Sequence, residues 1–314
     1  MKFYYFNVLM IKIKYNKNII VPIKILLNFF IIFIIYFTTK KPLRLAICTM
    51  ARKENLYIKE YVDYYLNLGF DHIFIFDDNE LGVENISDVI DNSYHESVTI
   101  YDYRKIIKEQ KVAFTLCYEM NKYDYDWIFM NDIDEFLVIK NDSLKHYLSN
   151  NNFKKCDFIK FHWVLATDNN LLHYDNRSLL ERFKEPYLND THIKTMVRGG
   201  IDDIQFDIHT PFISPHKNIS CNNKGEIYTN KEILFQDVFN INIEKAFIIH
   251  FKYKSTEEYI TKYKRGYHWR IGNIEFMMMR IREYFKDNNA TLEKIEYVER
   301  ELNLNLSQIK SRLK

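Results

Sequence analysis

Glycine is scarce in this chain. Only seven of the 314 residues are glycine, at positions 69, 82, 199, 200, 225, 266 and 272, whereas glycine usually makes up about 7% of a protein. These positions form neither the G-x-G-x-x-G nor the G-x-x-x-x-G-K-[ST] pattern. Because a dinucleotide fingerprint or a P-loop needs one of those patterns, both kinds of phosphate-binding loop are excluded.

A strong net charge and clustered cysteines are also missing. Lys and Arg number 44 against 42 Asp and Glu, which leaves a formal charge of +2, and such a balance gives no strong attraction to nucleic acid. The four cysteines stand far apart without a C-x-x-C pair, which argues against a structural zinc site. Most lie in apolar runs, so we expect free buried thiols rather than disulfides. They are Cys48, Cys117, Cys156 and Cys221.

The apolar residues are sufficient for a folded core, and one apolar stretch raises the question of a membrane. The chain is 47% hydrophobic and 27% charged, which excludes general disorder. Residues 19–37 are apolar except for Pro22, Lys24 and Asn28, close to the roughly 20 residues that a span needs. No small-residue cleavage site follows. We expect a membrane or signal anchor, with a docked hydrophobic segment as the alternative, and a protein that is membrane-associated but otherwise cytoplasmic.

After Pro42 the chain alternates between apolar runs and helical patterns. Strands are expected at 43–49, 72–78, 97–103 and 126–130, and helices at 54–69, where Gly69 is a C-cap, and around 105–122. Such alternation predicts an α/β fold with a mostly parallel sheet and crossover helices. Further on, we expect strands at 156–166 and 246–253, with shorter ones at 192–197 and 207–213. A capping box opens a helix at 255–266, and an amphipathic helix from about 291 is expected to pack on the body.

Two aspartates follow the fourth expected strand directly. In Asp132-Ile133-Asp134 the two-residue spacing puts both carboxylates on one side of an extended segment. Carboxylates pinned between two apolar runs are costly to bury without a cation, and oxygen ligands suit Mg²⁺ or Mn²⁺. A haloacid-dehalogenase phosphatase also begins with a strand and D-x-D, but it needs Thr or Val where Phe136 stands. A divalent cation that neutralises a diphosphate leaving group is the favoured interpretation.

Other candidate residues come late in the chain. His250 lies in an apolar strand, where a lone histidine is usually a hydrogen-bonded core residue. A basic run follows it, which by itself is usually a solvated helix face and beside a diphosphate could clamp phosphate. The run consists of Lys252, Lys254, Lys262, Lys264, Arg265 and Arg270.

Taken together, these segments resemble glycosyltransferase family 92 and the neighbouring family-2-like transferases, which adopt the GT-A fold. The resemblance extends from about Leu45 to Trp269. It rests on five segments in the expected order: the stretch 46–79, the segment CYEMNKYDYDWIFMNDIDEFL, LLERF, IHTPFISPH and IIHFKYKSTEEYITKYKRG. It implies a Rossmann-like catalytic domain over residues 43–272, preceded by a hydrophobic segment over 1–42 and followed by a helical tail over 273–314.

The resemblance also implies roles for individual residues. Asp132 and Asp134 match the D-x-D motif that holds the divalent cation and the nucleotide sugar, and His250 matches a further metal ligand. Residues that match the nucleotide and diphosphate pocket are Lys53, Glu54, Asn55, Asp77, Gln110 and Lys254. The loop Asp78-Asn79-Glu80 departs from the family pattern, which usually has Ser or Gly there.

The expected function is transfer of a sugar from a nucleoside-diphosphate donor to a hydroxyl of a glycan, with Mn²⁺ or Mg²⁺. If the reaction inverts, a carboxylate deprotonates the acceptor, and Glu181 is the first candidate, with Asp203 second. A salt bridge of Glu181 with Arg182 is the alternative for that residue. The rival function is a non-catalytic glycan- or nucleotide-binding protein on the same fold.

Overall fold

A computed structural model describes residues 42–104, 109–184, 187–213, 218–228, 241–264 and 274–311. The expected anchor at 19–37 and the basic residues Arg265 and Arg270 lie outside these ranges. Leu43–Lys314 forms a compact unit distinct from Met1–Pro42. In the described part of the chain, every helix is too short or too polar to span a bilayer.

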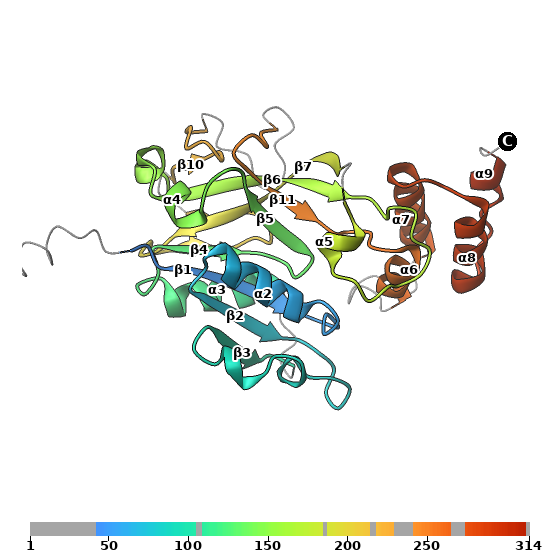
Figure 1. Ribbon diagram of the computed structural model, residues 1–314, viewed down its shortest axis with the longest axis horizontal. Coiled ribbons are helices and arrows are strands. Elements are labelled where there is room, and N and C mark those ends of the chain that lie inside the picture. The colour runs from blue at the N-terminus through green and yellow to red at the C-terminus, as the bar shows by residue number, and fades with distance from the viewer. Residues whose placement is uncertain are drawn as a thin grey trace, which may run out of the picture. The chain divides into compact units, whose positions relative to one another are not determined.

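The first half of this unit is a parallel sheet with helices between its strands (Figure 1). The strands pair in the order β3-β2-β1-β4, and each neighbouring pair is parallel. Gly69 ends α2 in the left-handed conformation with a φ of 112°, which glycine adopts without a steric penalty. The alternation expected from sequence is confirmed here. The elements are β1 (Leu45–Ala51), α2 (Ile58–Leu68), β2 (His72–Asp77), β3 (Val98–Asp102), α3 (Gln110–Asn121) and β4 (Trp127–Met130).

The second half makes the sheet mixed, which corrects the expectation of a mostly parallel sheet. The sheet continues from β4 in the order β7-β6-β11-β5, and β10 pairs with β6. The pairs β4–β7, β6–β7 and β5–β11 are antiparallel, while β11 runs parallel to β6. Antiparallel neighbours do not require the long crossover connection that parallel strands need. The strands are β5 (Glu135–Ile139), β6 (Phe158–Ala166), β7 (Tyr187–Arg198), β10 (Ser220–Cys221) and β11 (Ala246–His250).

Helices α2 and α3 cover opposite faces of the sheet. Leu45 and Ile47 of β1 pack in one buried cluster with α2, while Ala46 packs in a second cluster with Phe114 of α3. This division follows from the two-residue period of a strand. Short elements complete this part: the helices α4 (Leu144–Leu148) and α5 (Leu179–Arg182), the strands β8 (Ile204–Gln205) and β9 (Phe212–Ile213), and 3₁₀ turns at Ile86–Asp88, Asn92–Tyr94 and Asn151–Lys155.

The C-terminal helices pack on the sheet domain, as expected for the amphipathic pattern. Ile295 and Val298 of α8 are fully buried. Lys294 donates Nζ–H to Oδ2 of Asp168 at 2.7 Å, and this ion pair joins α8 to the segment just after β6. The helices are α6 (Thr256–Lys264), α7 (Ile274–Asp287), α8 (Leu292–Leu302) and α9 (Ser307–Lys310).

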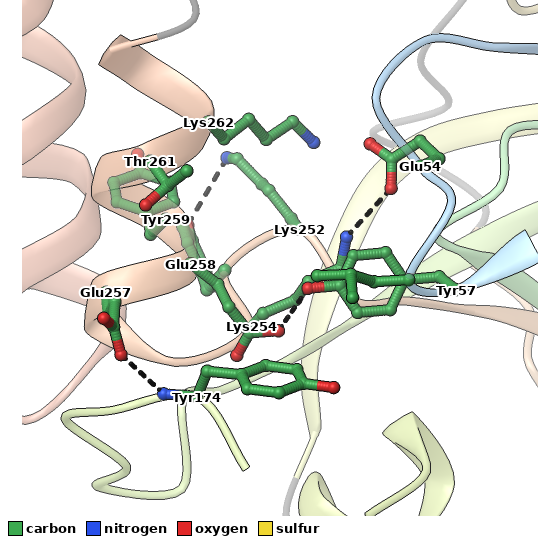
Figure 2. A pocket seen from close by; sticks show the side chains of 12 residues that line it. Glu54, Tyr57, Tyr174, Lys252, Lys254, Glu257, Glu258, Tyr259, Thr261 and Lys262 are labelled. Carbon is green, nitrogen blue, oxygen red and sulfur yellow. Dashed lines mark hydrogen bonds and ion pairs between the residues drawn. The ribbon is translucent and has the colours of Figure 1, made fainter. Parts of the chain in front are cut away.

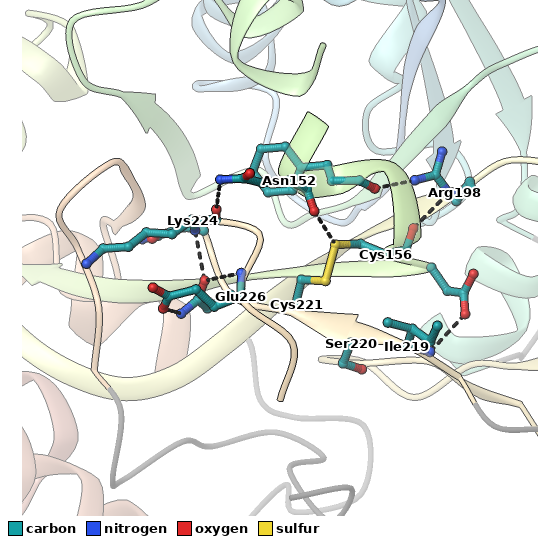
Figure 3. Close-up of a disulfide and its surroundings, with 12 residues drawn as sticks. Asn152, Cys156, Arg198, Ile219, Ser220, Cys221, Lys224 and Glu226 are labelled. Carbon is teal, nitrogen blue, oxygen red and sulfur yellow. Dashed lines mark hydrogen bonds between the residues drawn. A yellow bond between two sulfur atoms is a disulfide. The ribbon is translucent and has the colours of Figure 1, made fainter. Parts of the chain in front are cut away.

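The cysteines form two disulfides, so the expectation of free thiols was wrong. Cys48 of β1 bonds to Cys117 of α3, and Cys156 before β6 bonds to Cys221 of β10 (Figure 3). The partners are 69 and 65 residues apart in sequence. Sheet pairing brings the second pair together, because β10 lies directly beside the start of β6. Spacing along the chain gave no sign of either contact.

Candidate active site

Several strands end at one place, and the two aspartates of the D-x-D motif lie there. Asp132 and Asp134 occupy the short connection between β4 and β5. His250 is the last residue of β11 and pairs with Glu135 across the antiparallel β5. Phe251 then donates its backbone N–H to the Asp134 carbonyl at 2.8 Å. The fold therefore brings the late histidine beside the second aspartate, while the metal-binding role that the family resemblance implies for both stays a prediction.

Asp134 is a buried carboxylate with basic neighbours. Its Oδ1 lies 3.6 Å from Nε2 of His250, and Lys262 of α6 donates Nζ–H to Oδ2 at 2.8 Å. Burial alone would raise the pKa of Asp134, but Lys262 and His250 outweigh it and hold that pKa well below its usual value. Burial lowers the pKa of His250. A neutral imidazole thus faces an ionised carboxylate, which is the protonation state that metal ligands require.

Asp132 has its own partners. Lys194 of β7 donates to Oδ2 at 2.8 Å, and Gln110 at the start of α3 donates its side-chain amide to Oδ1. Burial raises the pKa of Asp132, but the Lys194 ammonium outweighs this effect and lowers it overall. Lys194 is fully buried. Lys194 is not among the predicted site residues, although a lysine within the expected strand 192–197 was a detectable signal.

Glu135 follows the motif directly and is fully buried. One of its oxygens accepts the backbone N–H of Asp132 at 3.2 Å, and the other lies 3.7 Å from Nζ of Lys194. Burial raises the pKa of Glu135 well above its usual value despite that lysine. This hydrogen bond from Asp132 to the buried Glu135 side chain therefore holds the backbone of the D-x-D turn in place.

The residues suit a divalent cation that takes some of its ligands from the protein and the others from a bound substrate. Among the described residues, no group of three or more His, Cys, Asp or Glu side chains is arranged as a complete metal site. The 3.6 Å separation of Asp134 and His250 suits two ligands of one ion. Mg²⁺ commonly takes one or two carboxylates from protein and completes its shell with phosphate and water. Asp134 and His250 could supply two protein ligands of such a site.

A cavity of about 160 Å³ lies between the loop after β1 and helix α6. We call it the lysine cavity, because Lys252, Lys254 and Lys262 all line it. Figure 2 shows Lys254 between Glu54 and Tyr57: its Nζ lies 3.4 Å from Glu54 and 3.8 Å from the centre of the tyrosine ring. The cavity joins predicted nucleotide-pocket residues to Lys262, which contacts the D-x-D motif.

The remaining predicted nucleotide residues shape the loops beside β1 and β2. The Asp77 carboxylate accepts backbone N–H groups of Asn79 at 3.0 Å and Ile86 at 2.9 Å. Lys53 has a φ of 56°, and its Nζ lies 2.7 Å from a carboxylate oxygen of Glu80. Their contacts order these loops, while their predicted contact with a nucleotide stays a prediction.

Neither predicted catalytic base touches the D-x-D residues through a described hydrogen bond or ion pair. Glu181 is exposed and closes a capping box with Ser178 at the start of α5. It is Arg182, not Glu181, that forms a buried ion pair, with Glu258 at 2.7 Å. Asp203 is exposed and has a φ of 58° in the turn before β8. The proposed role of Glu181 and Asp203 in deprotonation stays a prediction.

A second cavity of about 240 Å³ lies on the other side of Lys252, Tyr259 and Lys262, which line both cavities. We call it the histidine cavity. Its further lining residues include Trp163, Asp190, His192, His209, His250 and Glu283. The sequence analysis did not single out Trp163, Asp190 or His192, because they lie on β6 and β7 far from any motif.

Comparison with known proteins identifies the class of this arrangement. The sequence model of glycosyltransferase family 92 matches residues 41–303. The chain belongs to glycosyltransferase family 92. It is 30% identical over 117 residues to a family 92 protein of Oryza sativa subsp. japonica, covering 37% of this chain and 20% of that protein. It is also 30% identical over 99 residues to one of Ricinus communis, covering 31% and 17%. The chain thus matches about a fifth of the length of these relatives.

Proposed function

We propose that this protein transfers a sugar from a nucleoside-diphosphate donor to a hydroxyl of a glycan, on a GT-A-like domain. Membership of family 92 supports the reaction class. The main support for a nucleoside-diphosphate donor is that Asp134, His250 and Lys262 lie together at the ends of the strands, beside the lysine cavity. Open α/β sheets bind their ligands at that edge.

The lysine cavity suits the leaving diphosphate. Lys252 and Lys254 follow the end of β11, and Lys262 lies in α6. All three line the cavity, so three ammonium groups can face the phosphate oxygens. When the bond to the sugar breaks, negative charge develops on the diphosphate, and groups fixed there in advance stabilise it. Lys262 would exchange its contact with Asp134 for a phosphate oxygen when donor and cation bind.

We also propose that the reaction requires Mn²⁺ or Mg²⁺. Asp134 and His250 would hold the ion, and Asp132, which pairs with Lys194, would have to turn towards them to serve as a third ligand. A bound cation would act as a Lewis acid on the diphosphate. Glu135 and Gln110 would keep the motif in place, because one accepts the Asp132 backbone N–H and the other donates to its carboxylate.

The Asp134→Ala substitution tests the donor site. We expect it to abolish both transfer and slow hydrolysis of the donor, and to abolish thermal stabilisation by Mn²⁺ together with a UDP- or GDP-sugar. The matched control is Asp124→Ala, since Asp124 is exposed in the loop before β4. Unchanged turnover in a folded Asp134→Ala protein would end the proposal.

The same thermal-shift screen separates the enzyme from the rival binding protein. An enzyme is stabilised by a nucleotide sugar in a metal-dependent manner and then hydrolyses it slowly. Stabilisation by free glycans alone, with no hydrolysis of any donor, would favour a non-catalytic glycan-binding protein.

We further propose that residues 19–37 associate the protein with a membrane, where tethering raises the concentration of enzyme near its acceptor. The support is the apolar composition of that stretch. We expect the full-length chain to stay with membranes after carbonate washing, and a chain starting at Pro42 to be soluble and active. Recovery of the full-length chain wholly in the soluble fraction would show that the segment is not an anchor.

A further inference from the structure

The histidine cavity differs chemically from the lysine cavity that adjoins it. It shares Lys252 and Lys262 with that cavity, but it adds Trp163 and three histidines, together with Asp190, Arg280 and Glu283. We propose that the histidine cavity binds the acceptor sugar of the reaction proposed above, on which this inference rests. The ligand class is an uncharged sugar ring with free hydroxyls.

Two residues of the lining each have a buried ring nitrogen that lacks a partner among the described residues. Trp163 Nε1 and His250 Nδ1 have no hydrogen-bond partner among the described residues, although the two residues are only 7% and 8% exposed. A buried polar group without a partner is costly, and native proteins rarely leave one. A sugar hydroxyl both donates and accepts, so it can serve an indole N–H and an imidazole nitrogen alike.

The wall around these atoms is aromatic, and two of the cations that share the lining, Lys252 and Arg280, are both paired with Glu283. The His192 ring stacks on Trp163 with centroids 5.0 Å apart, and the His209 ring lies 5.3 Å from it. Burial lowers the pKa of His209 to about 4, so this ring is uncharged at neutral pH. Asp190 holds His192, with Oδ1 2.6 Å from Nδ1, and offers a carboxylate to hydroxyl donors. This combination suits a sugar better than it suits a diphosphate.

The position and the volume of the histidine cavity both support its assignment as the acceptor site. His250 lines it and lies 3.6 Å from Asp134, so a bound sugar would stand beside the proposed cation and diphosphate. The lysine cavity on the opposite side contains Glu54 and Lys254, which match nucleotide-pocket residues. A volume of about 240 Å³ is below the roughly 300–1,000 Å³ of pockets for drug-sized ligands, which favours a single sugar unit.

Direct binding tests the assignment without a donor. Saturation-transfer NMR would be recorded with methyl glycosides of glucose, galactose, mannose, N-acetylglucosamine and fucose. The probe that binds best would be titrated into Trp163→Phe, which keeps a ring and removes the N–H, and into Asp190→Asn. We expect Trp163→Phe to bind about 2- to 10-fold more weakly, the range for one neutral hydrogen bond, and Asp190→Asn to bind at least about 10-fold more weakly, because hydrogen bonds to a charged carboxylate are stronger. Asp124→Asn, the same change on the exposed loop, should bind like the wild type.

Kinetics separate the acceptor from the donor. Trp163→Phe should raise KM for the acceptor glycoside and leave KM for the nucleotide sugar unchanged, while Lys254→Met in the lysine cavity should do the reverse. Unchanged glycoside binding in both folded variants, or a rise in donor KM with Trp163→Phe, would overturn the acceptor assignment. If no nucleotide sugar is hydrolysed but glycoside binding still depends on Trp163, the proposed reaction fails and the sugar site stands.

Discussion

At the scale of single residues, the site depends on how buried charges compensate one another. Lys194 compensates Asp132 and Lys262 compensates Asp134, at 2.8 Å in both cases. Glu135 has only the more distant Lys194, at 3.7 Å. Lys194 and Asp134 are the buried members of these pairs. Removing the partner of either would leave an uncompensated buried charge and destabilise the fold as well as the site.

The titration of Glu135 is expected to make the free energy of unfolding depend on pH. Its pKa in the folded protein is raised above the usual 4.5 by burial. The group therefore favours folding below pH 4.5, and this contribution is lost as the pH rises towards the folded pKa. Relative to Glu135→Gln, whose amide oxygen can still accept the Asp132 N–H, the wild type should lose about 1.4 kcal/mol of unfolding free energy per pH unit in that window.

Urea unfolding of the wild type and Glu135→Gln from about pH 4.5 to 7 measures this difference. Glu135→Ala is the control for the hydrogen bond, and we expect it to be less stable than Glu135→Gln at every pH. Parallel curves for the wild type and Glu135→Gln would show that Glu135 keeps an ordinary pKa in the fold.

At the scale of elements, the sequence predicted what local patterns determine. The alternation of β1 to β4 with α2 and α3, the cap at Gly69 and the capping box of Ser255 with Glu258 all have short-range signals, and all are present. The sequence also placed Asp134 and His250 together, although the family resemblance supplied that pairing.

The sequence did not predict which strands, far apart along the chain, pair with one another in the sheet. The antiparallel insertion of β7 between β4 and β6 brings Lys194 to Asp132, and no local pattern encodes which strand lies beside which. The same insertion places His192 against Trp163, and so creates the histidine cavity. Glu181 shows the converse: a family-like segment suggested catalysis, whereas its described contacts cap α5.

At the scale of the whole molecule, the two disulfides cross-link the sheet domain at separate places. One joins β1 to α3 and the other joins the start of β6 to β10. Disulfides persist mainly in oxidising compartments and are rare in the cytosol. The cross-links therefore favour an oxidising compartment over the cytoplasmic placement expected from sequence.

The disulfides also predict how the protein responds to reduction. All four cysteines are fully buried, and the closed loops of 69 and 65 residues each correspond to about 4 kcal/mol of stabilisation in the chain-entropy model. We expect no thiol to react with Ellman's reagent in guanidinium without reductant, and four thiols to react after reduction. Replacing Cys156 and Cys221 together by alanine should lower Tm markedly and make the remaining loss on reduction smaller. Four reactive thiols in unreduced protein that was purified from an oxidising compartment would show that the cysteines stay free, and the stability of this domain would then rest on its packing alone.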